Sequence, residues 1–138
     1  MLQVNALKVS YGQSEAIREI SFVAEQNETV AIMGRNGMGK TTLFKALIGI
    51  LPTRSGSITI DGKDLTNAES YQRVAGGLGY VPQGRMIFPT LTVQENIETG
   101  LENAKDKQIP QDIYALFPVL FDMRKRKGGN LSGGQQQR

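Results

Sequence analysis

The sequence contains no cysteine and no histidine among its 138 residues. Without cysteine the chain forms no disulfide and offers no thiolate for catalysis or metal binding, and it gives no indication of redox compartment. Without histidine, imidazole acid–base catalysis and histidine metal ligands are excluded. No apolar run approaches the roughly 18–20 residues that span a bilayer. The first residues, MLQVNALKVSYG, also lack the basic and apolar regions of a secretory signal.

The charge balance is only slightly basic, with a net charge of +3 and a pI near 9.3. A basic excess can indicate a nucleic acid or an acidic membrane surface as the partner. The densest basic stretch, RKRK at residues 124–127, has no interleaved aromatic residues, which argues against single-stranded nucleic acid. We predict a solvated loop or helix end there, with a partner contact as the alternative, and no nucleic-acid partner for the chain.

Glycine and proline divide the chain into short segments whose apolar spacing predicts strands and helices. Imperfect alternation predicts strands at residues 2–11 and 17–25, and a continuous apolar run at residues 30–33 is typical of a strand buried on both faces. Further strands are expected at residues 55–60, before a turn at Asp61 and Gly62, and at residues 77–83. Helices are expected at residues 41–50, 93–101 and 111–117, the second begun by a capping box of Thr92 and Glu95 and the third ended by Pro118.

Residues 34–42, GRNGMGKTT, match the pattern G-x-x-x-x-G-K-[ST] and lie between an expected buried strand and an expected amphipathic helix. Three glycines, Gly34, Gly37 and Gly39, permit a tight loop whose N–H groups point inward around phosphate oxygens. The loop opens onto a helix N-terminus, where unpaired N–H groups and the helix dipole favour an anion. A glycine-rich turn without a ligand is the alternative, and the strand and helix on either side argue against it.

The side chains at the end of this loop match the parts of a nucleoside triphosphate. Lys40 would reach the β and γ phosphates, Thr41 would offer its hydroxyl to Mg²⁺, and Thr42 would donate to the α phosphate. We therefore predict that the chain binds a nucleoside triphosphate. The predicted binding residues in this loop are Gly34, Arg35, Asn36, Gly37, Met38, Gly39, Lys40, Thr41 and Thr42.

The class of nucleotide is indicated by what surrounds the loop. A GTPase needs a guanine-reading N-K-x-D run and a D-x-x-G switch, and neither occurs in the sequence. An ATPase of this fold needs an aspartate at the end of a buried strand, beside a second carboxylate. Asp61 is followed by Gly62 in an expected hairpin, and Asp122 follows Pro118 in the helical part. We predict no catalytic carboxylate within these residues, and Asp122 is the alternative left open.

The last residues, LSGGQQQR, predict the start of a helix. Ser132 would cap it, and Gly133 and Gly134 would let backbone N–H groups approach another molecule. Together with the phosphate-binding loop upstream, LSGGQ resembles the signature motif of ATP-binding-cassette (ABC) ATPases. Two further positions fit that family. Tyr11 stands where its members have an aromatic residue that stacks on adenine, and Gln83 stands where they have the Q-loop glutamine that links Mg²⁺ and the attacking water to the transmembrane partner.

The resemblance runs from Met1 to Arg138 and implies an α/β fold, a P-loop NTPase core with an N-terminal antiparallel β subdomain and a partial α-helical subdomain. It divides the chain into residues 1–82, the nucleotide-binding core with the β subdomain and the P-loop, and residues 83–138, the Q-loop and the helical subdomain up to the signature. The stretches MGRNGMGKTTLFKALIG, GLGYVPQGRMIFPTLTVQENI and IYALFPVLFDMRKRKGGNLSGGQQQ most resemble ATPase subunits of branched-chain amino acid importers and, among these, the urea-importer subunit.

The resemblance also implies the cofactors and partners. ATP would bind with Mg²⁺, held through Thr41 and Gln83, at the cytoplasmic face of the inner (plasma) membrane. Two ATPase subunits, identical or different, would close head to tail, so that the signature of one caps the ATP in the P-loop of the other. Transmembrane permease subunits would contact residues 85–96, and an extracytoplasmic solute-binding protein would belong to the same system. The signature residues are Leu131, Ser132, Gly133, Gly134 and Gln135.

The sequence departs from the family pattern after the signature. Members continue through a helix to a strand ending in Asp-Glu and then to a switch histidine, and neither occurs here. We therefore expect a chain truncated after the signature, which binds ATP weakly, does not hydrolyse it alone, and is poorly soluble because its P-loop strand lacks a neighbour. Two alternatives remain: a cassette protein without a permease that acts on DNA or ribosomes, and a nucleotide-binding or regulatory module that naturally ends at Arg138.

Overall fold

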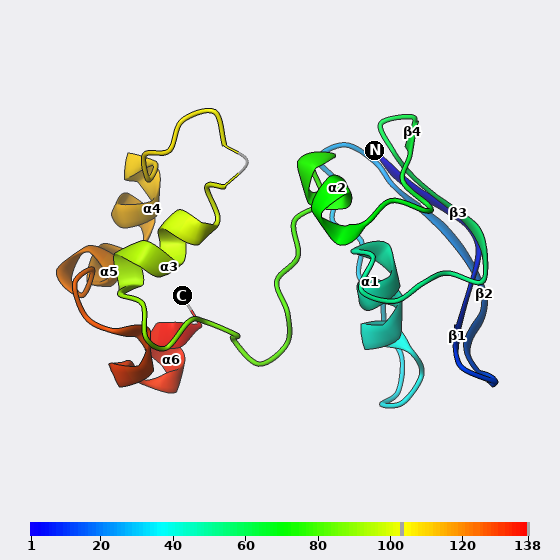
Figure 1. The fold of residues 1–138 in the computed structure, drawn as a ribbon, viewed down its shortest axis with the longest axis horizontal. Coiled ribbons are helices and arrows are strands. Elements are labelled where there is room, and N and C mark those ends of the chain that lie inside the picture. The colour runs from blue at the N-terminus through cyan, green and yellow to red at the C-terminus, as the bar shows by residue number, and fades with distance from the viewer. Residues whose placement is uncertain (103, 138) are drawn as a thin grey trace. The chain divides into compact units, whose positions relative to one another are not determined.

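The computed structural model describes residues 1–102 and 104–137, and the chain forms two compact units, Met1–Tyr80 and Val81–Arg138 (Figure 1). The boundary between the two units along the chain follows Tyr80, whereas the boundary expected from the sequence follows residue 82. Each unit has buried apolar side chains of its own. No helix in the described ranges is both long enough and apolar enough to cross a membrane.

The first unit is built on a four-stranded antiparallel sheet. Strands β1 (Leu2–Tyr11) and β2 (Ser14–Ala24) form a hairpin, and β1 also pairs with β3 (Ser55–Ile60), which turns into the short β4 (Lys63–Asp64). The order across the sheet is therefore β2-β1-β3-β4. The strands predicted at residues 2–11, 17–25 and 55–60 are confirmed. The turn predicted between β3 and β4 is also confirmed, with Asp61 and Gly62 at φ values of 48° and 78°.

An irregularity in β1 explains why its apolar residues alternate imperfectly. The pairing with β2 shifts register between Val4 and Leu7, and Ala6 within that step has a φ of 43°. A bulge of this kind inserts an extra residue into one strand, so the inward face continues at Leu7 and Val9. Val4, Leu7 and Val9 are all fully buried as a result.

Helix α1 (Lys40–Leu47) lies beside the sheet and packs its apolar face against it (Figure 1). Leu43, Ala46 and Leu47 are buried in one cluster with the core residues of β1 and β3. The helix ends at Leu47, and Gly49 just beyond it has the positive φ, 85°, that commonly closes a helix. The helix predicted at residues 41–50 is confirmed in place and is shorter at its C-terminal end.

Helix α2 (Ser70–Ala75) was not expected from the apolar pattern. It begins with a capping box, in which the Gln72 side-chain oxygen accepts the Glu69 N–H at 2.9 Å. The only buried residue of this helix is Arg73, which is charged. The apolar periodicity that marks a helix in a sequence is therefore absent here.

Two of the predicted strands are wrong. Residues 30–33 and residues 77–83 are not strands, and neither segment joins a strand ladder among the described residues. An apolar run becomes a strand only where a neighbouring strand satisfies its backbone N–H and C=O groups. Without that neighbour, Met33 is 89% exposed and Val81 is 87% exposed.

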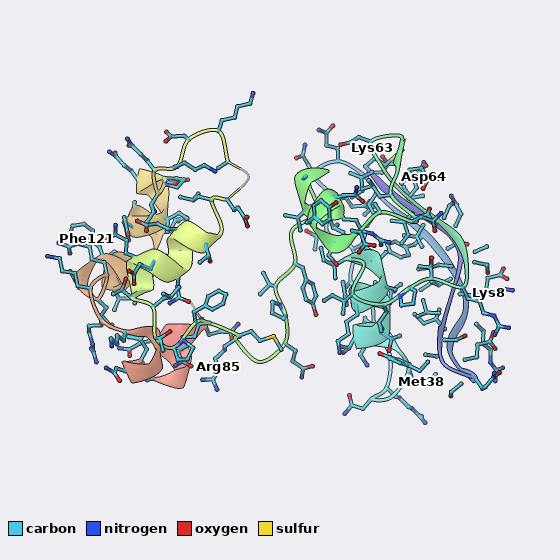
Figure 2. The ribbon with its side chains drawn as sticks, in the orientation of Figure 1. Lys8, Met38, Lys63, Asp64, Arg85 and Phe121 are labelled. Atoms are coloured by element: carbon cyan, nitrogen blue, oxygen red, sulfur yellow. The ribbon has the colours of Figure 1, made fainter. Side chains whose placement is uncertain are left out.

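The second unit contains short helices: α3 (Val93–Thr99), α4 (Gln111–Leu116), α5 (Pro118–Asp122), the 3₁₀ turn η1 (Gly128–Asn130) and α6 (Gly133–Gln136). The helices predicted at residues 93–101 and 111–117 are confirmed, and the second ends because Pro118 begins α5. The basic residues 124–127 follow α5 in a turn, where the Arg124 guanidinium lies 4.0 Å from the centre of the Phe121 ring (Phe121 is labelled in Figure 2).

The predicted capping box at the start of α3 is confirmed. The Thr92 hydroxyl oxygen accepts the Glu95 N–H at 3.2 Å, and the Glu95 carboxylate accepts the Thr92 N–H at 2.7 Å and the Thr92 hydroxyl at 2.8 Å. These hydrogen bonds from Thr92 lower the pKa of Glu95, and the charge of Lys127 lowers it further. The ionised carboxylate is therefore part of the helix start.

The second unit is expected to lose stability in acid through Glu95. Because the folded-state pKa of Glu95 lies below its ordinary value of 4.5, the ionised carboxylate stabilises the fold above that pH. The contribution is lost as the pH falls through the folded-state value. Glu95→Gln keeps an oxygen that accepts the Thr92 N–H, so the variant should show a smaller drop in urea midpoint between about pH 6 and about pH 3. An equal drop in both proteins would contradict this role.

Candidate functional site

Residues 34–39 form the turn that leads into α1, with two glycines in left-handed backbone conformations. Gly37 and Gly39 have φ values of 83° and 84°, which residues with a Cβ rarely adopt. Gly39 also lies against β2, because a Cβ placed on it would be 3.0 Å from the Ala16 carbonyl oxygen and 3.4 Å from Ile17 Cγ1. Glycine at this position therefore sets both the shape of the loop and its distance from the sheet.

The N-terminal end of α1 carries no capping side chain and no acidic residue in its first turn, as far as the described residues show. The Leu43 N–H donates to the Gly39 carbonyl at 2.8 Å, so the N–H groups of residues 40–42 precede the helical ladder. Together with the helix dipole, these N–H groups make the end of the loop partially positive. Thr41 is exposed and Thr42 is half-buried in the same turn.

Lys40 adds a full positive charge to this loop. Its Nζ donates to the carbonyl oxygens of Gly34 at 2.6 Å and Arg35 at 2.7 Å, so the side chain bends back across the loop from the first residue of the helix. Within the described ranges no carboxylate forms an ion pair with it. Neutral carbonyl groups therefore hold the ammonium, and its charge is not cancelled by a neighbouring side chain.

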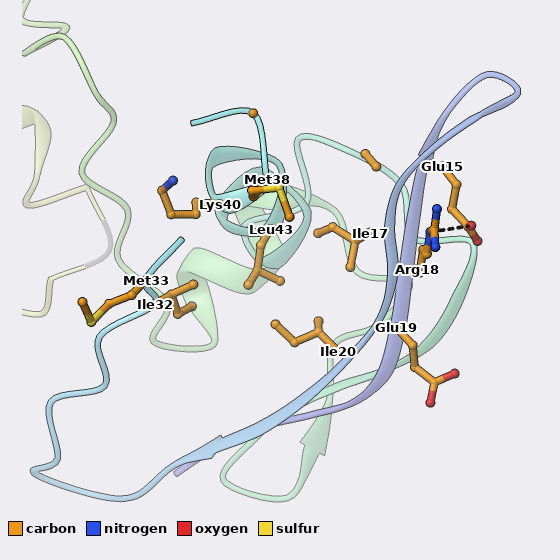
Figure 3. Close-up of a pocket in the computed structure, with 13 residues that line it drawn as sticks. Glu15, Ile17, Arg18, Glu19, Ile20, Ile32, Met33, Met38, Lys40 and Leu43 are labelled. Carbon is orange, nitrogen blue, oxygen red and sulfur yellow. Dashed lines mark ion pairs between the residues drawn. The ribbon is translucent and has the colours of Figure 1, made fainter. Parts of the chain in front are cut away.

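A cavity of about 590 Å³ opens between this loop and β2 (Figure 3). This volume is typical of small-molecule sites. The Arg18 and Glu15 side chains lie on the side of β2 away from the loop, with Arg18 Nε 3.9 Å from the Glu15 carboxylate (Figure 3). The apolar wall is made by side chains from β2, from the segment before the loop and from α1: Ile17, Ile20, Ile32, Met33 and Leu43.

Tyr11 does not line this cavity. It lies at the end of β1, opposite Ser14 across the hairpin turn, and is 48% exposed. The structure therefore brings Lys40 to the cavity wall and leaves Tyr11 outside the residues that line it.

The other predicted site residues belong to the second unit. Gln83 is exposed in a turn, and the next three residues, Gly84, Arg85 and Met86, have φ values of 95°, 69° and 37°. This run of left-handed residues is unusual for side chains with a Cβ. The Met86 N–H donates to the Gly84 carbonyl at 2.8 Å, which closes a tight turn directly after Gln83.

The signature residues lie at the start of α6. Ser132 caps this helix as predicted, because its Oγ accepts the Gln135 N–H at 3.4 Å and its own N–H donates to Gln135 Oε1 at 2.9 Å. Leu131 is half-buried, and both glycines of the motif are exposed. A Cβ placed on Gly133 would lie 2.5 Å from Arg85 Nη1, so the segment after Gln83 meets the signature within this unit (Arg85 is labelled in Figure 2).

Sequence reasoning missed two parts of these sites. The wall that Ala16 and Ile17 provide behind the loop depends on where β2 lies in the sheet, and no local pattern signals it. The approach of Arg85 to Gly133 joins residues far apart in the chain. A glycine in a motif is the one available signal of such close approach.

The chain belongs to the ABC transporter family. A model of that family, described as ABC transporter, matches residues 17–138. The high-affinity branched-chain amino acid transport ATP-binding protein BraG of Pseudomonas aeruginosa is 34% identical, over 99% of this chain and 60% of BraG. The spermidine/putrescine import ATP-binding protein PotA of Haemophilus influenzae is 37% identical, over the whole of this chain and 37% of PotA.

Solved structures show the same fold. The dimeric ATP-binding cassette MJ0796, bound to ADP and Pi, has a TM-score of 0.81 at 24% identity, over 99% of this chain and 66% of that cassette. The fold is therefore α/β, the P-loop NTPase core of ABC ATPases with its antiparallel β subdomain and part of its helical subdomain. The resemblance to ABC ATPases is confirmed, and the chain spans 60% of the length of BraG.

Proposed function

We propose that this chain is the ATP-binding part of an importer ATPase subunit, which couples ATP binding and hydrolysis to uptake of branched-chain amino acids, amides or urea through separate permease subunits. The observation that carries this proposal is the loop around Lys40. Left-handed glycines, an uncapped helix start and an ammonium group meet at a cavity of nucleotide size. BraG, a branched-chain amino acid transport protein, supports the transport role. Urea as the solute rests only on the resemblance of the stretches quoted above, of which residues 82–85 and 87–89 are the most telling.

The loop suits the phosphates of ATP because all its charge is positive. The N–H groups of residues 40–42 and the Lys40 ammonium would donate to phosphate oxygens, which would replace the Gly34 and Arg35 carbonyls as acceptors. The Thr42 hydroxyl would donate to the α phosphate. Tyr11 offers an exposed ring on which adenine would stack.

Magnesium fits one residue of this unit. The exposed Thr41 hydroxyl, on the first turn of α1, would hold Mg²⁺. Gln83, the second Mg²⁺ residue that the resemblance implies, stays a prediction. When bound, Mg²⁺ would neutralise part of the charge of the phosphates.

The partners are proposed from the family. The signature residues, Leu131 to Gln135, would contact ATP held by a second ATPase subunit, as the dimeric state of MJ0796 supports. Residues 85–96 would contact the permease, and an extracytoplasmic solute-binding protein would deliver the solute. These contacts would hold the chain at the cytoplasmic face of the inner membrane as a peripheral subunit.

ATP binding without turnover by these residues is the second candidate, and the position of Asp61 favours it. Asp61 lies in the β3–β4 turn, paired with the N-terminal amine of Met1, and Asp122 ends α5 in the second unit. Asp61 does not line the cavity beside the loop. We therefore assign ATP binding to this chain and hydrolysis to the whole protein.

Titration of the chain with ATP, ADP and AMP, each with Mg²⁺, tests the proposal. ATP and ADP should bind, and AMP should bind far more weakly, because the loop contacts the phosphates beyond the first. Equal affinity for ATP and AMP, or no binding of either, would overturn the assignment. Steady release of phosphate from ATP, lost on Lys40→Ala, would show instead that these residues suffice for hydrolysis.

Phe88→Asp should disrupt coupling to the permease and leave ATP binding unchanged. The Phe88 ring is 55% exposed, and its backbone is held by Asn96, whose side chain accepts the Phe88 N–H at 2.8 Å and donates to the Phe88 carbonyl at 3.0 Å. The backbone hydrogen bonds do not depend on the ring, so the fold should survive. Solute uptake by the assembled importer and ATP affinity are the two measurements, and a parallel fall in ATP affinity would show that the ring has a packing role instead.

A further inference from the structure

Arg73 of α2 is the only buried charged side chain in the described structure, with 3% of its surface exposed. Its guanidinium donates four hydrogen bonds, all to backbone carbonyl oxygens. Nη1 contacts Ala46 at 2.7 Å and Leu47 at 2.8 Å, Nε contacts Ala68 at 2.8 Å, and Nη2 contacts Thr66 at 2.8 Å. The side chain therefore joins three segments of the first unit: α1, the turn after β4, and α2.

Two of these four carbonyls belong to the last turn of α1, the helix that begins at the phosphate-binding loop. Carbonyls in the last turn carry the negative end of the helix dipole, so a cation is favourable there. The Ala46 carbonyl also accepts the Gly49 N–H at 3.1 Å. Gly49 leaves the space that the guanidinium occupies, because a Cβ on Gly49 would lie 3.0 Å from Arg73 Nε. The planar fork of arginine suits several fixed acceptors at once, which a lysine ammonium does not match.

We propose that Arg73 is a positioning residue for the phosphate-binding loop, acting through the C-terminal end of α1. This inference rests on the proposed binding of ATP. The N-terminal end of α1 is fixed by the close approach of Gly39 to Ala16, and Arg73 fixes the other end. The apolar contacts between them are not directional, so they hold α1 on the sheet without fixing its rotation or its shift along the helix axis. The guanidinium supplies that directional restraint.

The test separates ATP affinity from the number of binding sites in the full chain. Loss of a positioning contact raises the dissociation constant at unchanged stoichiometry, whereas a purely structural loss lowers the fraction of competent molecules and leaves the affinity of the rest unchanged. Arg73→Met should raise the ATP dissociation constant about tenfold. Arg73→Lys should raise it by a smaller factor, because lysine keeps the cation at the end of α1 but not the planar fork. The measurement is calorimetric titration near the temperature of maximum stability.

Two matched variants serve as controls. Lys63→Met removes an exposed cation of β4 in the same unit, away from the cavity beside the loop, and Ile58→Val weakens the core without changing a side chain that contacts Arg73. Both should keep the ATP dissociation constant, and only Ile58→Val should lower the urea midpoint. The inference is overturned if Arg73→Met lowers stoichiometry or midpoint while its dissociation constant stays within about twofold of the original. If Arg73→Met does not fold, Arg73→Lys decides in the same way.

Amide hydrogen exchange keeps this inference separate from the proposed function. If the original chain does not bind ATP, the proposed function fails. The exchange rates then still show whether Arg73 restrains the C-terminal end of α1. Arg73→Met should then speed exchange at residues 44–47 relative to Ile58→Val, compared at denaturant concentrations that give equal global stability. Equal exchange in the two variants would overturn the positioning role.

Discussion

Lys40→Met is expected to weaken ATP binding by about 10–100-fold, the size expected for losing charge-assisted hydrogen bonds. Methionine keeps a flexible stem of similar length and removes the ammonium that now contacts the Gly34 and Arg35 carbonyls. The helix start keeps its N–H groups, so some phosphate binding should remain. The assay is titration with Mg·ATP.

Lys45→Met is the matched control for this prediction. Lys45 lies in the last turn of the same helix, so the substitution removes an equal charge from the opposite end. It should leave ATP affinity nearly unchanged. AMP gives the second comparison, because a lysine that contacts the β and γ phosphates has little effect on a monophosphate. A similar loss for ATP and AMP would mean that the loop, and not the lysine charge, was altered.

Gly56→Ala is expected to destabilise the first unit by about 3 kcal/mol or more, which places it among strongly destabilising substitutions. Gly56 has a φ of 94°, and a Cβ on it would lie 2.5 Å from the Asn5 carbonyl oxygen and 2.6 Å from that of Ala6. Those carbonyls belong to the bulge in β1, so backbone would have to move. The measurement is the urea midpoint, with the slope of the transition checked for two-state behaviour.

Gly62→Ala separates the two causes of the expected loss of stability, which are the positive φ and the contact of the added Cβ with the bulge. Gly62 also has a positive φ, 78°, but nothing lies within 4 Å of a Cβ placed on it. Gly62→Ala should therefore lower the free energy of unfolding only by the cost of placing an alanine at a positive φ, about 1 kcal/mol. If both substitutions cost the same, the contact with the bulge carries no stability of its own.

Features set by near neighbours in the chain could be predicted from the sequence. The Thr92 and Ser132 helix starts, the β3–β4 turn and the loop before Lys40 each depend on a few consecutive residues, and the structure has them where the pattern indicates. Residues 30–33 fail for the opposite reason. Their apolar side chains favour a buried strand, but strand formation depends on a partner that local pattern does not reveal.

The candidate site likewise has parts that could be predicted from the sequence and parts that could not. The glycines and Lys40 of the loop follow from one motif, whereas the cavity wall from β2 depends on how β1 is bulged and paired. Arg73 is the plainest omission. An arginine in a short polar helix indicates an exposed residue, and only the fold places four carbonyl oxygens around it.

Strand β1 pairs on one side with the strand that follows it and on the other with β3, so that Leu2 lies opposite Ile60. The β1–β2 hairpin closes a short turn and should form within about 1–10 μs. Pairing with β3 must instead close a chain segment that contains the whole phosphate-binding loop and α1, which carries a larger entropy cost and slows folding. Because β1 and β3 together form the surface on which α1 packs, the nucleotide loop should take its final shape only in the last step of folding of this unit.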